Sequence, residues 1–205
     1  MSPLTAALWL LAAYLLGATP TSYVAGRLAK GLDLREHGSK NLGATNVYRV
    51  LGWGWAIPVG LIDIAKGAVP VAVFGPWAHG APGFPVFLGL AAVLGHIFSP
   101  YVGFKGGKGV ATAAGMFLAL APYAVLISLP VWGLCVWVTG YVSLSSILVA
   151  AVFPVLILLT PHAGAPAVVA SIGLAVLIIY SHRANIRRLL AGTENRFRTR
   201  KEPAP

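Results

Sequence analysis

The sequence has few acidic residues and almost no cysteine. Its five Asp and Glu residues are outnumbered by fifteen Lys and Arg residues, and charged residues make up only 10% of the 205-residue chain. Because hard cations beside phosphate need several carboxylates, this scarcity predicts no metal site, and no other cofactor is indicated. The single cysteine, Cys135, lies in an apolar run, which excludes disulfides and Cys-based metal sites.

Hydrophobic residues, by contrast, make up 58% of the chain, and the mean hydropathy is +0.80. A soluble domain of this length cannot bury so much apolar surface, so we expect an all-α integral membrane protein. The basic residues stand in short loops, where they orient helices and contact anionic lipid; they do not indicate nucleic-acid binding. The first apolar stretch follows no basic segment and is too long for a cleavable signal, so we interpret it as a retained helix.

Loop charge predicts the topology. The basic segments 27–49, 105–108 and the tail from residue 182 are expected on the cytoplasmic side, and the neutral loops 75–85 and 161–166 outside. The N-terminus is then outside and the C-terminus cytoplasmic. Apolar spans are expected at about 4–24, 53–74, 86–98, 110–160 and 166–180.

The long apolar region 110–160 must cross an odd number of times under this topology. Since one crossing needs about 20 residues, the region favours three short helices, broken near Pro122 and at Gly140–Ser143. The prediction is therefore seven transmembrane helices, with five plus a re-entrant hairpin as the alternative. Residues 1–205 form one polytopic domain, in which 195–205 is expected to be a flexible tail.

Three polar segments, 37–49, 95–112 and 182–194, are predicted to share the cytoplasmic face. The first concentrates neutral donors and acceptors suited to hydroxyls and phosphate oxygens, namely Ser39, Asn41, Thr45 and Asn46. Lys40 and Arg49 add positive charge, and only the arginine can bind phosphate oxygens bidentately. The alternative interpretation is a polar loop whose charges merely set topology.

The second segment, Gly95 to Thr112, places two lysines among glycines ahead of an apolar helix. Glycines allow close approach to a ligand, and a helix N-terminus attracts an anion. Neither the Walker A pattern nor the dinucleotide fingerprint fits, so nucleotide binding is not supported. Of the two lysines, Lys108 is the better candidate for binding an anion. Lys105 can be interpreted equally well as a ligand or as a residue that only sets topology. His96 is either a catalytic base or a structural histidine.

The third segment, residues 182–194, has Ile186, Leu189 and Leu190 at helical spacing, which predicts an interfacial amphipathic helix. A basic membrane-surface tail explains the arginines of this segment. It does not explain His182 and Asn185, which share a helix face, or Glu194. Within the second span, Asp63 and Lys66 are expected to neutralise each other.

Together the three segments resemble the motifs of a known family. They read His37-Gly-Ser-Lys-Asn-Leu-Gly-Ala-Thr-Asn-Val-Tyr-Arg49, Gly103-Phe-Lys-Gly-Gly-Lys-Gly-Val-Ala-Thr112 and His182-Arg-Ala-Asn-Ile-Arg-Arg-Leu-Leu-Ala-Gly-Thr-Glu194. The family is that of the bacterial acyl-phosphate-dependent glycerol-3-phosphate acyltransferases (PlsY), small enzymes of the plasma (inner) membrane. Two positions depart from its pattern: Ala18 replaces a frequent serine, and Ser99 replaces a usual proline.

The resemblance implies seven helices, an outside N-terminus and an active site on the cytoplasmic face. It implies transfer of a fatty acyl group from acyl phosphate to the 1-hydroxyl of glycerol 3-phosphate, giving lysophosphatidic acid for phospholipid synthesis. The implied catalytic residues are Ser39, Arg49, Lys108, His182 and Asn185. The expected substrate contacts are Lys40, Asn41, Thr45, Asn46, His96, Lys105, Gly106, Gly107, Arg183, Arg187 and Glu194.

Because an acyl phosphate already carries a good leaving group, direct attack without an acyl-enzyme is expected. The base is left open among His182, His96 and, preferentially, a substrate phosphate oxygen. Gly106 and Gly107 are expected to offer backbone N–H groups to phosphate, and small residues such as Gly95 and Gly115 to leave room for the acyl chain. The competing hypothesis is a transporter or channel for phosphate compounds, although no internal repeat favours it. A monomer is compatible with the sequence.

Overall fold

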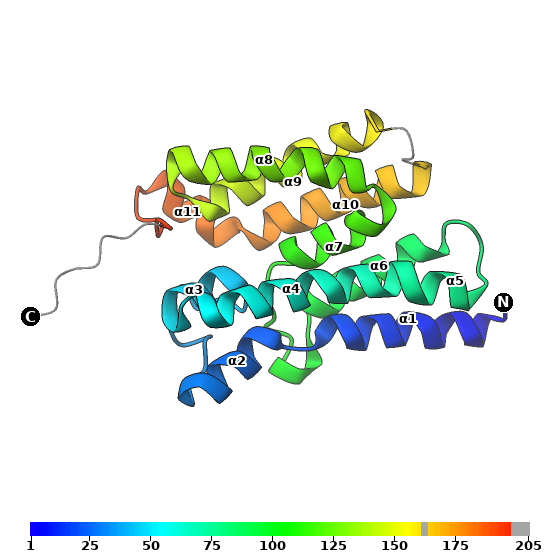
Figure 1. Cartoon of the computed structure of the whole chain (residues 1–205), viewed down its shortest axis with the longest axis horizontal. Coiled ribbons are helices and arrows are strands. Elements are labelled where there is room, and N and C mark those ends of the chain that lie inside the picture. Colours follow the sequence, from blue (N-terminus) through cyan, green and yellow to red (C-terminus); the bar gives the residue numbers. More distant parts are fainter. Residues whose placement is uncertain (161–163, 198–205) are drawn as a thin grey trace, which may run out of the picture.

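The computed structural model describes residues 1–160 and 164–197, and every regular element within them is a helix. Figure 1 shows an elongated bundle with the N-terminus at one end and α3 and α11 at the other. The elements, in chain order, are α1 (Pro3–Ala18), α2 (Thr21–Lys30), α3 (Ala44–Leu51), α4 (Trp53–Val69), η1 (Pro70–Phe74), α5 (Gly75–Ala78), α6 (Phe84–Ile97), η2 (Pro100–Val102), α7 (Val110–Leu120), α8 (Pro122–Thr139), α9 (Val142–Leu158), α10 (Ala165–Ser181) and α11 (Arg183–Leu190).

Four of the described helical segments are long and apolar enough to cross a membrane. They are Pro3–Lys30, Trp53–Ala78, Phe84–Val102 and Pro122–Thr139. The pair α10 and α11, bent by 56°, supplies a fifth if it counts as one span, whereas α7 and α9 are shorter apolar helices. The all-helical membrane architecture is thus confirmed. Seven crossings, and the side on which each terminus lies, stay predictions.

The region 110–160 contains the three helices that its length indicates. Pro122 occupies the first turn of α8, where a missing N–H costs no intrahelical hydrogen bond. Gly140 ends the same helix in the left-handed conformation, with φ of 77°, which glycine adopts without steric cost. Local breaker residues therefore divide this apolar stretch.

The helices form two layers with α7 between them (Figure 1). In the first layer, α1 packs on α6, and α4 packs on both α3 and α7; in the second, α9 packs on both α8 and α10. A Cβ atom on Gly67 would overlap the Thr112 carbonyl, and one on Gly115 would overlap that of Ile64. The backbones of α4 and α7 are consequently in direct contact, as small residues allow between membrane helices.

Gly95 makes the same kind of contact between α6 and α1, because its Cβ position is taken by the carbonyl of Tyr14. The expectation that Gly95 and Gly115 leave room for an acyl chain is therefore wrong. Both glycines are filled by neighbouring backbone, and the empty space in the bundle lies elsewhere.

Candidate active site

Residues of the three polar segments are linked by hydrogen bonds near the end of the bundle that carries α3 and α11. Lys108 Nζ donates a hydrogen bond to Asn185 Oδ1, which joins the second segment to the third. Arg49 donates from a terminal guanidinium nitrogen to the Asn195 carbonyl at 3.3 Å, which joins the first segment to the chain just beyond the third. Residues more than seventy positions apart thus form one polar cluster.

Lys108 stands immediately before the N-terminus of α7. Gly109, with φ of 81°, is the N-cap of that helix and provides no side-chain cap. The first-turn N–H groups of α7 have no intrahelical acceptor, and the helix dipole adds positive potential at the same point. Burial lowers the pKa of Lys108 to about 8, with Glu194 opposing the shift and Arg188 and Arg49 adding to it. The amine and the helix end together suit a phosphate group.

Glu194 is the hub that orients Asn185. Its carboxylate accepts hydrogen bonds from Asn185 Nδ2 at 2.6 Å, Ser143 Oγ at 2.8 Å and Arg188 Nε at 2.7 Å. Burial alone would raise the pKa of Glu194, but these donors outweigh it and the net shift is downward. Since the Asn185 amide nitrogen is held by this carboxylate, its oxygen turns to Lys108. We therefore assign Glu194 to positioning, because an ionised carboxylate repels a phosphate.

Two members of this hub, Ser143 and Arg188, are not among the residues predicted for the site. Ser143 follows the break at Gly140 and is the second residue of α9, and a polar side chain at the start of an apolar helix is a signal in the sequence. The interpretation of the third segment as a basic membrane-surface tail also explains Arg188, and nothing in its spacing separates it from Arg187. Arg188 is partly buried against Glu194, whereas Arg187 is exposed.

His182 is buried at the junction of α10 and α11, and its Nδ1 lies 2.8 Å from the Ile178 carbonyl oxygen. A carbonyl only accepts, so Nδ1 carries the hydrogen in this bond. The neutral ring then has Nε2 as its acceptor, which suits a substrate hydroxyl.

The Gly106–Gly107 pair fastens the loop to the end of α6. Gly106 N–H donates to the Ile97 carbonyl at 3.1 Å, and Gly107 N–H donates to the His96 carbonyl at 3.0 Å. A Cβ on Gly107 would overlap His96 Nε2. The expectation that these two N–H groups contact phosphate is therefore wrong, because carbonyls already occupy them. His96 is buried behind the loop and supports it.

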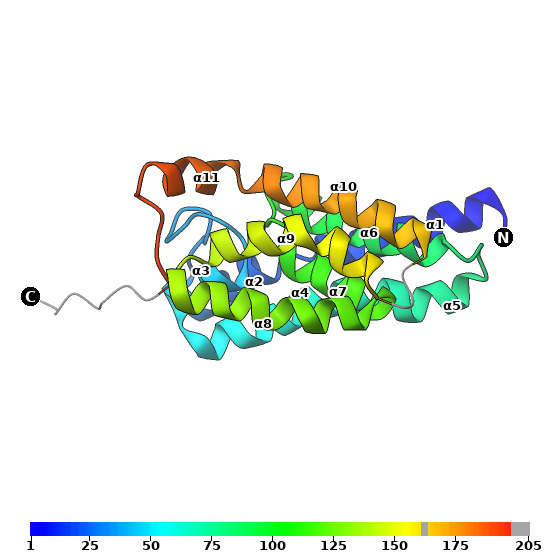
Figure 2. The ribbon, with the colours of Figure 1, turned by 90° about the horizontal axis from the view of Figure 1, so that it is seen from above.

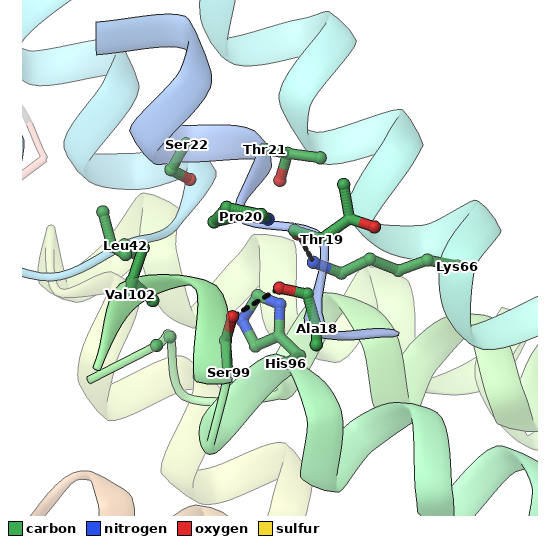
Figure 3. Close-up of a pocket in the computed structure, with 12 residues that line it drawn as sticks. Ala18, Thr19, Pro20, Thr21, Ser22, Leu42, Lys66, His96, Ser99 and Val102 are labelled. Atoms are coloured by element: carbon green, nitrogen blue, oxygen red, sulfur yellow. Dashed lines mark hydrogen bonds between the residues drawn. The ribbon is translucent and has the colours of Figure 1, made fainter. Parts of the chain in front are cut away.

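Behind His96 lies a buried ion pair, shown in part in Figure 3. Lys66 Nζ is 2.8 Å from Asp63 Oδ1 and also donates to the Thr19 carbonyl at 3.0 Å, at the break between α1 and α2. The expected mutual neutralisation of Asp63 and Lys66 is thus observed. The adjoining cavity, lined in part by His96 and Lys66, measures about 10 Å³, room for about one water molecule.

The two departures from the family pattern meet in this region. Ser99 Oγ donates to the Ala18 carbonyl at 2.6 Å, and both residues are buried (Figure 3). The hydroxyl at position 99 ties the loop after α6 to the end of α1. This turn is therefore held by a direct bond between the two divergent positions.

Asn46 holds the first polar loop. Its Oδ1 accepts from the Ser39 backbone N–H at 2.7 Å, and its Nδ2 donates to the carbonyls of Leu34 and His37 at 3.0 and 3.1 Å. Each polar atom of the amide is thereby engaged, so we reassign Asn46 from substrate contact to positioning of Ser39.

The remaining predicted contacts lie around the cluster and stay predictions. Arg183 is exposed and turns away to the Tyr180 ring, 4.5 Å from its centroid, and to the Tyr180 carbonyl. The other exposed residues of this set are Lys40, Lys105 and Arg187, and the half-buried ones are Asn41 and Thr45.

An apolar cavity of about 70 Å³ lies next to the polar cluster, between α7, α8, α9 and α10. Val110, two residues after Lys108, lines it, as does Ile178, whose carbonyl bonds His182. Ala113, Phe117, Ala150, Phe153 and Ala175 are among its other lining residues.

Comparison with known proteins shows a family match over nearly the whole chain. The family model described as glycerol-3-phosphate acyltransferase matches residues 7–192. The chain belongs to this family. A glycerol-3-phosphate acyltransferase of Trichlorobacter lovleyi is 47% identical, over 93% of this chain and 96% of the relative. One of Chlorobaculum parvum is 45% identical, over 90% of this chain and 93% of the relative.

Two solved structures of the family share the fold. Both are described as PlsY (YgiH), an integral membrane glycerol 3-phosphate acyltransferase. The glycerol 3-phosphate form has a TM-score of 0.87 and 40% identity, and covers 95% of this chain and 96% of its own. The lysophosphatidic acid form has a TM-score of 0.83 and 39% identity, and covers 93% and 94%.

Proposed function

We propose that this protein transfers a fatty acyl group from acyl phosphate to the 1-hydroxyl of glycerol 3-phosphate and so forms lysophosphatidic acid. The observation that carries the proposal is the Lys108–Asn185 contact at the N-terminus of α7, with an apolar cavity beside it. One site thereby offers a place for phosphate next to a place for an acyl chain. The family's solved structures with glycerol 3-phosphate and lysophosphatidic acid support the substrate and the product.

Charge is the main obstacle to this reaction. Each substrate brings roughly two negative charges near neutral pH, as phosphate monoesters do. Burial is the main cause that lowers the pKa of Lys108 and that of Arg49; Arg188 lowers both further, and Arg49 lowers that of Lys108, so the three positive charges act on the same small volume. Together with the end of α7, they would offset the repulsion between the two phosphates and stabilise charge on the departing one.

The step itself needs no acyl-enzyme. The glycerol hydroxyl oxygen attacks the acyl carbonyl carbon, the bond from that carbon to the phosphate oxygen breaks, and its electron pair leaves with phosphate. The hydroxyl proton goes to a phosphate oxygen. His182 Nε2 and Ser39 would orient the hydroxyl, and Asn185 would hold Lys108 at the departing group.

The acyl chain would occupy the cavity between α7 and α10 and leave its carbonyl near Val110. In a membrane, lipid would surround these apolar helices, and the donor would enter the cavity from the bilayer. By loop charge, the polar end would face the cytoplasm across a bacterial plasma membrane, where soluble glycerol 3-phosphate is available.

Purified protein in detergent tests the proposal directly. Acyl phosphate and labelled glycerol 3-phosphate, without acyl-CoA or acyl carrier protein, should yield labelled lysophosphatidic acid and one phosphate per product. Lys108→Ala should nearly abolish the product, whereas Lys30→Ala, an exposed lysine at the same end, should not. Formation of product from acyl-CoA alone would contradict the proposal that acyl phosphate is the donor. Phosphate flux into proteoliposomes without any product would favour the transporter hypothesis.

A further inference from the structure

The chain continues beyond α11 as a short extended segment across the polar end of the bundle. We call residues 194–197 the strap. Figure 2 shows this part of the chain leaving α11 and reaching the end of α8. It begins at Glu194, whose carboxylate holds Asn185 and Ser143, and so starts inside the polar cluster.

Phe197 anchors the far end of the strap. Its ring stacks on Tyr48, with centroids 4.9 Å apart and planes at 28°, and meets the edge of Trp53 at 5.8 Å. Its backbone N–H donates to the Gly140 carbonyl at 2.7 Å. The residue therefore bonds the end of α8 while packing on α3 and α4, which belong to the other layer.

Arg196 adds a second contact to the second layer, at the turn between α8 and α9. Its guanidinium lies 5.3 Å from the centre of the Tyr141 ring, and its Nε donates to the Tyr141 hydroxyl at 3.2 Å. This side chain is exposed, so we treat the contact as secondary to the aromatic one.

Arg49 contacts the strap. It follows Tyr48, the residue on which Phe197 stacks, and its guanidinium bonds the Asn195 carbonyl in the middle of the strap. A long arginine beside two other cations needs such a fixed acceptor, because repulsion from Lys108 and Arg188 would otherwise drive it outward.

We propose that the strap positions Arg49 against Lys108 and that Phe197 is the positioning residue that keeps it closed. The proposal rests on the proposed function, in which both cations bind substrate phosphate. Phe197 itself would contact neither substrate.

Kinetics in detergent test the proposal with four variants. Phe197→Ala should lower kcat/KM for glycerol 3-phosphate by about tenfold to a hundredfold, the range expected from misplacing a substrate-binding group. Phe197→Tyr should restore most of it. Asn195→Ala should match the wild type, because the bond uses the backbone carbonyl. Phe87→Ala, which removes a lipid-exposed phenylalanine of α6, controls for the loss of a ring.

A double-mutant cycle with Arg49→Ala separates positioning from general stabilisation. If Phe197 acts through Arg49, its replacement should cost little more once Arg49 is gone. Full additivity of the two losses, or a Phe197→Ala enzyme with wild-type kcat/KM, would overturn the proposal.

Binding keeps this outcome distinct from failure of the proposed function. Glycerol 3-phosphate should raise the thermal unfolding midpoint of the wild type and raise it less in Phe197→Ala at the same concentration. This shift needs no acyl donor. If the wild type is inactive but its unfolding midpoint still rises more than that of Phe197→Ala, the proposed reaction is wrong and the role of the strap stands. Equal rises in both proteins would contradict the role of the strap.

Discussion

Lys108 is a lysine that titrates close to physiological pH. Its pKa of about 8 arises mainly from burial, so the amine loses its proton as the pH rises through 8. Phosphate binding needs the ammonium form, and kcat/KM should therefore fall above about pH 8. Lys108→Arg keeps its charge to much higher pH and should remove this alkaline limb, although at a lower maximum because guanidinium geometry differs. Profiles of kcat/KM from pH 6 to 10 for both proteins measure this alkaline limb. An unchanged limb in Lys108→Arg would contradict its assignment to Lys108.

The Asp63–Lys66 pair is a stability element rather than a reacting one. Both side chains are almost fully buried, with exposed fractions of 1% and 4%. Asp63→Asn leaves the lysine charge uncompensated and should cost about 3–5 kcal/mol. The double replacement Asp63→Asn with Lys66→Met removes both charges and should recover most of the loss. Thermal unfolding in detergent measures both; a stable single variant would show that the pair contributes little.

Residue types alone separated Lys108 from Lys105, since only the former stands between glycines at a helix start. Residue types could not distinguish side chains that contact substrate from side chains that position other residues. Asn46 and Glu194 look like substrate ligands in a linear motif, yet their partners are backbone carbonyls, a backbone N–H and side chains brought near by folding. Such assignments depend on tertiary hydrogen bonds, which spacing does not encode.

At the scale of helices, the cavity between α7 and α10 should set the acyl chain length. Ala150 of α9 lines it, and its neighbour Ala151 is exposed on the outside of the same helix. Ala150→Leu should shift the preference toward shorter acyl phosphates with little change in KM for glycerol 3-phosphate. Ala151→Leu should leave the preference unchanged. Competition among acyl phosphates of several lengths measures it, and identical profiles would rule out this cavity.

The breaks between helices were predictable because their causes are local. Pro122 and Gly140 act through their own backbone preferences, whatever they pack against. No comparable local signal marks the short interval from residue 98 to 109, where carbonyls at the end of α6 accept hydrogen bonds from the N–H groups of Gly106 and Gly107. These hydrogen bonds to His96 and Ile97 leave the two glycine N–H groups unavailable to a ligand.

For the whole molecule, loop charge predicts which end faces the cytoplasm. Two exposed alanines report on it, Ala81 in the loop before α6 and Ala191 after α11. With Cys135 replaced by alanine, Ala81→Cys should react with a membrane-impermeant maleimide in intact spheroplasts. Ala191→Cys should react only after permeabilisation. The reverse pattern would invert the topology, and labelling of both before permeabilisation would refute opposite placement of the two loops.

The gathering of three polar segments at one end also followed from loop charge. The two-layer packing did not, because apolar runs of similar composition do not reveal which helices pair. Gly17 and Gly95 allow close backbone contact between α1 and α6, and Gly67 and Gly115 allow it between α4 and α7. In the sequence these glycines look like those of any flexible or apolar segment.

These glycine contacts also impose an order on biosynthesis. A ribosome makes α1 first, yet the surface that accepts Gly17 belongs to α6, and the backbone groove that accepts Gly67 of α4 belongs to α7. Neither early helix can complete its packing until its later partner has entered the bilayer. The loop that carries Lys108 connects α6 to α7, so the residue at the centre of the site takes its place only as both pairs close.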